Sequence, residues 1–306
     1  MKKLEKETVL KERMILVGAV SFFIFILPYL VHLTINGIQP TIKNAFGNNP
    51  QIIQVQMNGG TESLQLETYL VGALAKYGNA EFEDEALKAI AVILRSNAVR
   101  TIIEEEAVSA DSFYTDAELR ILWQTEYEAN LQRYREIIVI TEGIVVFYNG
   151  DIVKVPFHKL SAGETRDGSF LKNKPPYITS VPSAEDMYAD GYYTTMEIKK
   201  NVLGDDFCIL GTDQFGYALS VQTNGQELSG EQFCQKYGIP SACFDYEIKE
   251  EAYLFYIRGN GHGYGVSLYG ANALAQKGWG FAEILEYYLP GIEIRRENCS
   301  DVIACL

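Results

Sequence analysis

The sequence is poor in basic charge. It has 26 lysines and arginines against 40 aspartates and glutamates, which gives a formal net charge of −14. Proteins that bind nucleic acid need clustered basic side chains, so this balance argues against a nucleic-acid partner. It argues equally against docking on anionic lipid by anything other than an anchor in the chain itself.

Cysteine is scarce and unpaired in sequence. No C-x-x-C pair occurs, which argues against a zinc knuckle. The five cysteines all lie in the second half: Cys208, Cys234, Cys243, Cys299 and Cys305. Two interpretations stay open, a Cys299–Cys305 disulfide or reduced and partly buried thiols.

Familiar catalytic motifs are also missing. Ser161 and Ser267 lie outside any G-x-S-x-G elbow. The glycine-rich stretch 259–270 lacks the Lys-Ser/Thr pair of a phosphate-binding loop. His158 and His262, the two histidines outside the first 35 residues, have no obvious third metal ligand. We therefore expect no cofactor and no metal.

What the chain does have is an apolar run near its start. Residues 14–35 contain no Asp, Glu, Lys or Arg, and about 20 apolar residues suffice to cross a bilayer as a helix. The lysine and arginine excess in residues 1–13 predicts a cytoplasmic N-terminus and an extracytoplasmic main domain. A cleaved signal peptide is the alternative, but its apolar region is shorter and ends in an A-x-A-like site, which is absent here.

Hydrophobic periodicity predicts an α+β fold. Apolar residues recur at helical spacing in 64–76, 83–105 and 116–136, and then alternate in strands 137–141, 144–148 and 152–157. Asn149-Gly150 predicts a tight hairpin between the last two strands. We also expect a strand at 52–57 and helices at 270–278 and 281–289.

Both histidines lie in unusual loops. His158 is in FHKLSAGET (157–165), and His262 is flanked by glycines in GNGHGYGVSLYGA (259–271). Glycines on both sides of a histidine allow the backbone to approach a ligand closely. A lone histidine usually makes a structural hydrogen bond, but two such loops together favour a shared cleft.

These loops resemble the signature segments of the stage II sporulation protein D (SpoIID/LytB) family. Further blocks are similar as well: 83–100, 176–183, 224–248 and the helix and hairpin before His158. The apolar run and the resemblance together predict the following division: a cytoplasmic tail 1–13, a transmembrane helix 14–35, a connection 36–60, a family domain 61–296 and a C-terminal tail 297–306.

Membership would imply a lytic transglycosylase that cuts peptide-free peptidoglycan strands during sporulation. In that family one glutamate protonates the leaving oxygen and then accepts the proton of the sugar's own 6-hydroxyl, which attacks. Aligned on E-A-L-K-A, the position of this glutamate is Tyr77. A phenol with an ordinary pKa near 10 is a poor acid at neutral pH.

Other family positions are partly retained. Glutamines are replaced by Ile90 and Leu268, and a tyrosine by Phe157. The resemblance implies that the substrate-binding residues are Arg95, His158, Ser161, Gly163, Thr165, His262, Ser267 and Tyr269. Some relatives hold zinc through Cys and His, but residues 106–137 contain neither.

Two hypotheses about activity follow. Glu81, four residues after Tyr77, could act as a substitute acid, although a solvated charge before a helix is the simpler interpretation. Alternatively, the protein binds glycan, or acts as a scaffold for wall-remodelling partners, without cutting. A carboxylate within hydrogen-bonding distance of His262 or Ser161, with Tyr77 turned away, would favour catalysis.

Overall fold

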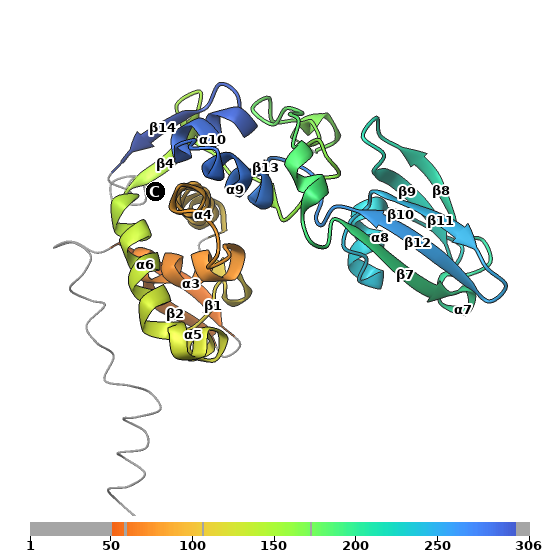
Figure 1. Ribbon diagram of the computed structural model, residues 1–306, viewed down its shortest axis with the longest axis horizontal. Helices are drawn as coiled ribbons and strands as arrows, with labels where there is room; N and C mark the ends of the chain where they lie inside the picture. Colours follow the sequence, from red (N-terminus) through yellow and green to blue (C-terminus); the bar gives the residue numbers. More distant parts are fainter. Residues whose placement is uncertain (1–50, 58–59, 106, 172, 298–306) are drawn as a thin grey trace, which may run out of the picture. The chain divides into compact units, whose positions relative to one another are not determined.

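The computed structural model describes residues 51–57, 60–105, 107–171 and 173–297 (Figure 1). The predicted tail 1–13, membrane helix 14–35 and Cys299–Cys305 pair lie outside these residues. Among the residues described, no helix has both the length and the apolar character needed to cross a bilayer.

The architecture is α+β, as predicted, with the described strands divided among small sheets. The strands are β1 (Ile52–Met57), β2 (Gly60–Gln65), β3 (Val108–Ser109), β4 (Ile144–Tyr148), β5 (Asp151–Ile152), β6 (Phe157–His158), β7 (Tyr193–Lys199), β8 (Cys208–Thr212), β9 (Ala218–Thr223), β10 (Gln226–Ser229), β11 (Phe244–Ile248), β12 (Ala252–Arg258), β13 (Val266–Ser267) and β14 (Glu293–Arg296). The α-helices are α3 (Leu66–Tyr77), α4 (Asp84–Glu105), α5 (Asp116–Trp123), α6 (Tyr127–Ile140), α7 (Lys200–Leu203), α8 (Gly230–Tyr237), α9 (Leu268–Gln276) and α10 (Phe281–Tyr288). Short 3-10 turns are η3 (Ala110–Ser112), η4 (Gln124–Glu126), η5 (Gly168–Phe170) and η6 (Ala184–Tyr188).

Helix α4 is the centre of the first core. It contacts α3, α6, α9, α10 and β4, and side chains in its middle, such as Ala89 and Ile93, have no exposed surface. Acidic residues open the helix, where they complement its dipole. The helices expected from periodicity at 64–76, 83–105, 270–278 and 281–289 are therefore confirmed.

The first strand belongs to the folded domain and not to a connection. β1 pairs with β2 in antiparallel and with β3 in parallel orientation, and Ile53 and Val55 are each only 1% exposed. The compact unit accordingly begins at Gln51 instead of residue 61. Alternating apolar residues mark this strand in the sequence, whereas the polar residues before it suggested a longer connection.

The single helix predicted at 116–136 is divided, and the strand predicted at 137–141 is wrong. Gln124 adopts a positive φ of 45°, which interrupts the helix between α5 and α6. Helix α6 then continues through Ile140. Ile137 and Ile138 are buried while Val139 and Ile140 are about half exposed, so this apolar run follows the two sides of a helix and not a pleated strand.

The predicted hairpin is confirmed. β4 pairs with β5 in antiparallel orientation around Asn149 and Gly150, whose φ angles of 52° and 89° are both positive. Positive φ at both central residues is what a type I′ turn requires. Strand β4 also pairs with β14 in antiparallel orientation, so the last described strand lies beside a strand from the middle of the chain. The expected strand 152–157 survives only as its two ends, in β5 and β6.

A second core lies between residues 193 and 258. Strands β11-β12-β7 form one antiparallel sheet and β10-β9-β8 another. Aromatic side chains fill the core beside them; Phe207, for example, contacts Phe233, Tyr253 and Phe255 with ring centroids about 5 Å apart. Offset and edge-to-face pairs of this kind stabilise beyond the area that they bury.

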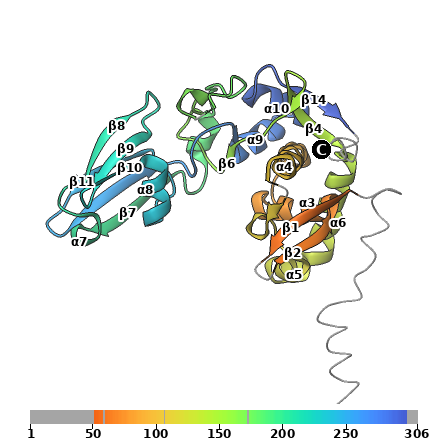
Figure 2. The same cartoon turned by 180° about the vertical axis from the view of Figure 1, so that it is seen from behind.

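The two histidine loops meet between these cores. β13 pairs with β6 in parallel, with Ser267 opposite His158 and Val266 opposite Phe157. Figure 2 shows β6 beside α9, the helix that follows β13. Helix α9 begins directly after β13, and its first turn is capped by the Ser267 hydroxyl. Segments about one hundred residues apart in the chain are thus held side by side.

Candidate functional site

One residue, Tyr264, holds both histidines by its backbone. Its carbonyl lies 3.0 Å from His158 Nδ1, and its amide nitrogen lies 3.0 Å from His262 Nδ1. A carbonyl only accepts and an amide N–H only donates. His158 therefore carries its proton on Nδ1, and neutral His262 carries its proton on Nε2. The ring centroids of the two histidines are 5.8 Å apart.

Both imidazoles are held neutral. Burial, and then the nearby His262, lower the pKa of His158 to about 3. Burial, and then the Arg166 guanidinium, lower the pKa of His262. At neutral pH the pair accordingly offers one acceptor, His158 Nε2, and one donor, His262 Nε2–H. The His158 Nε2 atom is shielded and has no hydrogen-bond partner among the described residues.

The glycines around His262 are required by protein packing. A Cβ added to Gly261 would lie 2.6 Å from the Cβ of His158, and one added to Gly263 would lie 2.6 Å from the Tyr217 hydroxyl. Both glycines also have positive φ angles, of 117° and 81°. We expected the backbone to approach a ligand here, but it approaches the other histidine loop and a buried tyrosine.

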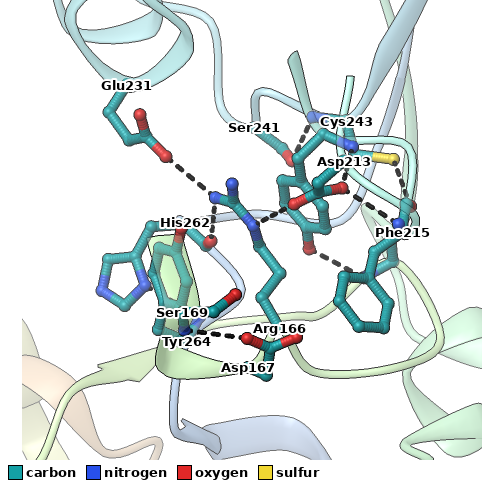
Figure 3. Close-up of polar contacts among 12 residues, drawn as sticks. Arg166, Asp167, Ser169, Asp213, Phe215, Glu231, Ser241, Cys243, His262 and Tyr264 are labelled. Carbon is teal, nitrogen blue, oxygen red and sulfur yellow. Dashed lines mark hydrogen bonds and ion pairs between the residues drawn. The ribbon is translucent and has the colours of Figure 1, made fainter. Parts of the chain in front are cut away.

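Arg166 anchors the histidine loop (Figure 3). Its Nε donates to Asp213 over 2.6 Å, and its Nη1 donates to Glu231 over 2.8 Å and to the His262 carbonyl over 3.0 Å. The guanidinium also lies over the rings of Tyr217 and Tyr264, at 4.6 and 4.3 Å from their centroids. The arginine side chain is 1% exposed. Its contacts therefore fix where the His262 backbone lies.

A buried carboxylate does meet Ser161. Asp186 accepts a 2.8 Å hydrogen bond from the Ser161 amide and another from the Ser267 hydroxyl. Burial raises the pKa of Asp186, whereas these donors lower it. Because the residue is 0% exposed and both oxygens are occupied, Asp186 joins the two loops and does not face a substrate.

Tyr77 lies at the end of α3 and packs edge-on against Phe157, with ring centroids 5.0 Å apart. Burial raises the pKa of its phenol above the ordinary value. Phe157 is the residue next to His158 in β6, so Tyr77 lies against the first histidine loop through its neighbour. In the part of the chain that the structure describes, neither imidazole hydrogen-bonds to a carboxylate or stacks on Tyr77.

Glu81 is exposed, and within the described ranges no hydrogen bond or ion pair joins it to the histidine loops. Its backbone N–H donates to the Asn79 side chain over 3.0 Å, which is a local turn before α4. Glu85, further along, accepts from the backbone N–H of Phe281 and so caps α10. The acidic residues before and at the start of α4 thus lie at the surface or at helix ends.

Several residues that the resemblance assigns to substrate are enclosed by protein. Arg95 is 0% exposed and forks onto Glu67, with N–O distances of 3.0 and 2.7 Å. Thr165 bonds to Val181. Ser161, Thr165 and Ser267 are also 0% exposed, so these four positions support the site without touching a ligand in this conformation. Gly163 and Tyr269 are partly exposed.

The two positions at which the resemblance implies glutamine are core positions. Ile90 is 1% exposed and Leu268 is 5% exposed. An apolar side chain is stabilised there by burial, at roughly 25 cal/mol per Å², whereas an amide would need hydrogen-bond partners. Ile90 and Leu268 thus fit the apolar interior around α4 and α9.

No group of three or more metal-ligating side chains is gathered anywhere in the described part of the chain. Cys208, Cys234 and Cys243 are free thiols.

Three contributors to the site were missed by sequence reasoning: Tyr264, Arg166 and Asp186. Tyr264 acts through its backbone, which gives no residue-type signal. Arg166 directly follows the FHKLSAGET segment, so its position was a signal that could have been used. Asp186 lies in a turn whose acidic residues resemble ordinary surface charges.

Comparison with known proteins places these features in context. A family model described as "Stage II sporulation protein" matches residues 56–148. The chain is 30% identical to stage II sporulation protein D of Bacillus subtilis (strain 168) over 261 residues, which covers 78% of this chain and 76% of that protein. It is 26% identical to stage II sporulation protein D of Bacillus amyloliquefaciens over 284 residues, which covers 84% and 81%.

Proposed function

The chain belongs to the stage II sporulation protein D family and is sporulation-related, and from this premise we propose that it binds peptidoglycan glycan strands with weakened or absent cutting activity. The family resemblance implies lytic transglycosylase chemistry, which needs a carboxylic acid beside the scissile bond. We thus propose that the glycan strand is still the ligand, but that the lytic transglycosylase activity is weakened or lost.

The observation that carries the proposal is the environment of Tyr77. At the position of the family's acid stands a phenol whose pKa is raised by burial and which packs against Phe157. A neutral phenol holds its proton too tightly to protonate a glycosidic oxygen at neutral pH. It also supplies no negative charge beside an oxocarbenium-like transition state.

The histidine pair supports the binding half of the proposal. A sugar hydroxyl both donates and accepts a hydrogen bond, and the pair carries one donor, His262 Nε2–H, and one acceptor, His158 Nε2. His262 is partly exposed, so its donor is open to a ligand hydroxyl. The enclosed His158 Nε2 has no partner among the described residues and would accept from a ligand only after a local opening of the site.

The proposed setting is the outer face of a membrane, with the N-terminal run 14–35 as a single-pass anchor and the folded domain extracytoplasmic. In this setting the glycan strand is the partner. Wall-remodelling proteins are the alternative partners if the domain serves as a scaffold.

The test uses the full-length chain in a mild detergent with purified peptide-free glycan strands. We expect the protein to co-pellet with the strands and to release no anhydro-ended products detectable by mass spectrometry. Glu81→Gln and the matched neighbour Glu83→Gln, which is also exposed, should behave like the wild type.

Two results would contradict the proposal. Anhydro-ended products from the wild type that disappear in Glu81→Gln but persist in Glu83→Gln would establish Glu81 as the acid. Failure of the wild type to co-pellet would exclude glycan binding and leave the scaffold role.

A further inference from the structure

A polar and aromatic pocket lies on the sheet β11-β12-β7. It has a volume of about 360 Å³ and is lined by Tyr193, Asp245, Tyr256 and Arg258. Tyr193 stands at the start of β7 and the others on β11 and β12. In the strand register Tyr193 is opposite Arg258 and Tyr256 is opposite Asp245, so all four belong to neighbouring positions of one sheet.

The tyrosines of this pocket are not explained by core packing. The opposite face of the sheet buries Phe244, Phe255 and Ile257 in the second core. A solvated face is normally polar, yet here the rings of Tyr193 and Tyr256 lie stacked, with centroids 6.4 Å apart and planes 28° apart. Tyr193 is 58% exposed and Tyr256 is partly exposed, so the two rings form an aromatic platform that is open to a ligand.

The charged pair beside the platform limits what the ligand can be. Arg258 Nη2 lies 3.2 Å from Asp245 Oδ2, and both side chains are largely open, at 40% and 76% exposed. Arg258 Nε is shielded and has no hydrogen-bond partner among the described residues. An anionic ligand would be repelled by Asp245 and a cationic ligand by Arg258. A neutral ligand that both donates and accepts hydrogen bonds suits the pair.

The pocket is tied to the histidine loops. Arg258 is followed by Gly259, whose N–H donates to the Tyr192 carbonyl, and the Tyr192 hydroxyl donates to the Ala162 carbonyl in the other loop. His262 is four residues after Arg258, so their Cα atoms are at most about 14 Å apart. A ligand that extends along the chain from His262 therefore reaches the platform within a few sugar rings.

We propose that Tyr193, Tyr256, Asp245 and Arg258 form a second sugar-binding site, which holds a neutral ring of the same glycan strand that lies at His262. The inference rests on the proposed function and deepens it. The rings of the tyrosines stack on the apolar face of the sugar, while Asp245 accepts from and Arg258 donates to its polar groups.

The test compares long and short peptide-free glycan fragments by equilibrium binding to the full-length chain. Tyr193→Ala and Tyr256→Ala should each weaken binding of long strands about tenfold, equivalent to about 1.4 kcal/mol, and leave binding of disaccharides unchanged. Tyr193→Phe should retain the wild-type affinity because it keeps the ring. Glu197→Ala is the matched control, since Glu197 is exposed on β7 outside the pocket.

The outcomes separate this inference from the proposed function. If the wild type binds no fragment, the proposed function fails and the second site fails with it. If the wild type binds and the Tyr193→Ala/Tyr256→Ala double variant, with an unchanged thermal midpoint, binds long strands equally well, the second site is refuted and the proposed function stands. Loss of binding only for strands that carry peptide stems would assign the pocket to peptide and overturn the inference.

Discussion

Two fully buried arginines hold different parts of this domain, and the difference shows how the site is built. Arg95 joins helix α4 to Glu67 on α3 and to the Ile138 and Ile144 carbonyls. Arg166 joins an irregular loop to Asp213, to Glu231 and to the His262 carbonyl. Helices keep their place by packing, whereas a glycine-rich loop needs polar anchors. We infer that Arg95 serves stability and that Arg166 also serves the geometry of the site.

The largest expected effect is that of Arg166→Met. It would leave the Asp213 carboxylate, whose side chain is 0% exposed, without its cation. Removing one partner of a buried pair costs about 3–5 kcal/mol, so we expect a loss at the upper end of this range in equilibrium unfolding of the full-length chain. The fraction that remains folded should bind glycan poorly. Wild-type stability would show that Arg166 is not an anchor.

Arg95→Met should cost less, about 3 kcal/mol. Its partner Glu67 retains 12% exposure, so water partly replaces the lost cation. Glycan binding by the folded fraction should be unchanged. The double variant Arg95→Met/Glu67→Met should recover most of the stability, because no unpaired charge remains. Loss of glycan binding in a folded Arg95→Met protein would contradict the inference that Arg95 serves stability alone.

The buried, neutral His158 should make the folded protein less stable in acid. The pKa of His158 is about 3 in the folded protein and about 6.5 when unfolded, so the unfolded state binds an extra proton below pH 6.5. Stability should therefore fall as pH falls from about 6.5 toward 3, by about 1.4 kcal/mol per pH unit from this group. Unfolding free energies between pH 6 and pH 5 measure the slope, and His158→Asn should reduce it by that amount. An identical slope in both proteins would contradict a neutral buried His158.

The smallest expected effect is that of Glu231→Gln. The Glu231 side chain is 44% exposed, and exposed ion pairs contribute about 0–1 kcal/mol. We expect a change in unfolding free energy within that range and retained glycan binding, since Asp213 still holds Arg166. A loss as large as that of Arg166→Met would mean that Glu231, and not Asp213, is the principal anchor.

Much of the fold was predictable because it depends on local periodicity. The helix at 83–105 and the Asn149-Gly150 hairpin both follow from spacing and turn chemistry, and both are observed. The strand predicted at 137–141 failed because an apolar run has no period of its own; packing of Ile137 and Ile138 extended α6 instead. The meeting of the two histidine loops was expected from their unusual composition. Its cause, the pairing of β6 with β13, is a non-local contact that no local pattern specifies.

The roles within the site were less predictable. Arg95 and Ser267 were assigned to substrate through resemblance, but the structure encloses both in protein. The reverse holds for Arg166 and Asp186, which carry the polar contacts that join the loops. These roles depend on hydrogen-bond and charge partners that lie far away in the sequence. Sequence spacing does not reveal which distant residues become partners.

The most direct test of the central claim restores the acid. Incubation of the Tyr77→Glu protein with peptide-free glycan strands should yield anhydro-ended products, detected by mass spectrometry, because the site still binds glycan and the glutamate supplies the missing acid. The wild type should yield none. Anhydro-ended products from the wild type at the level of Tyr77→Glu would contradict the claim that the phenol at Tyr77 has replaced the family's catalytic function.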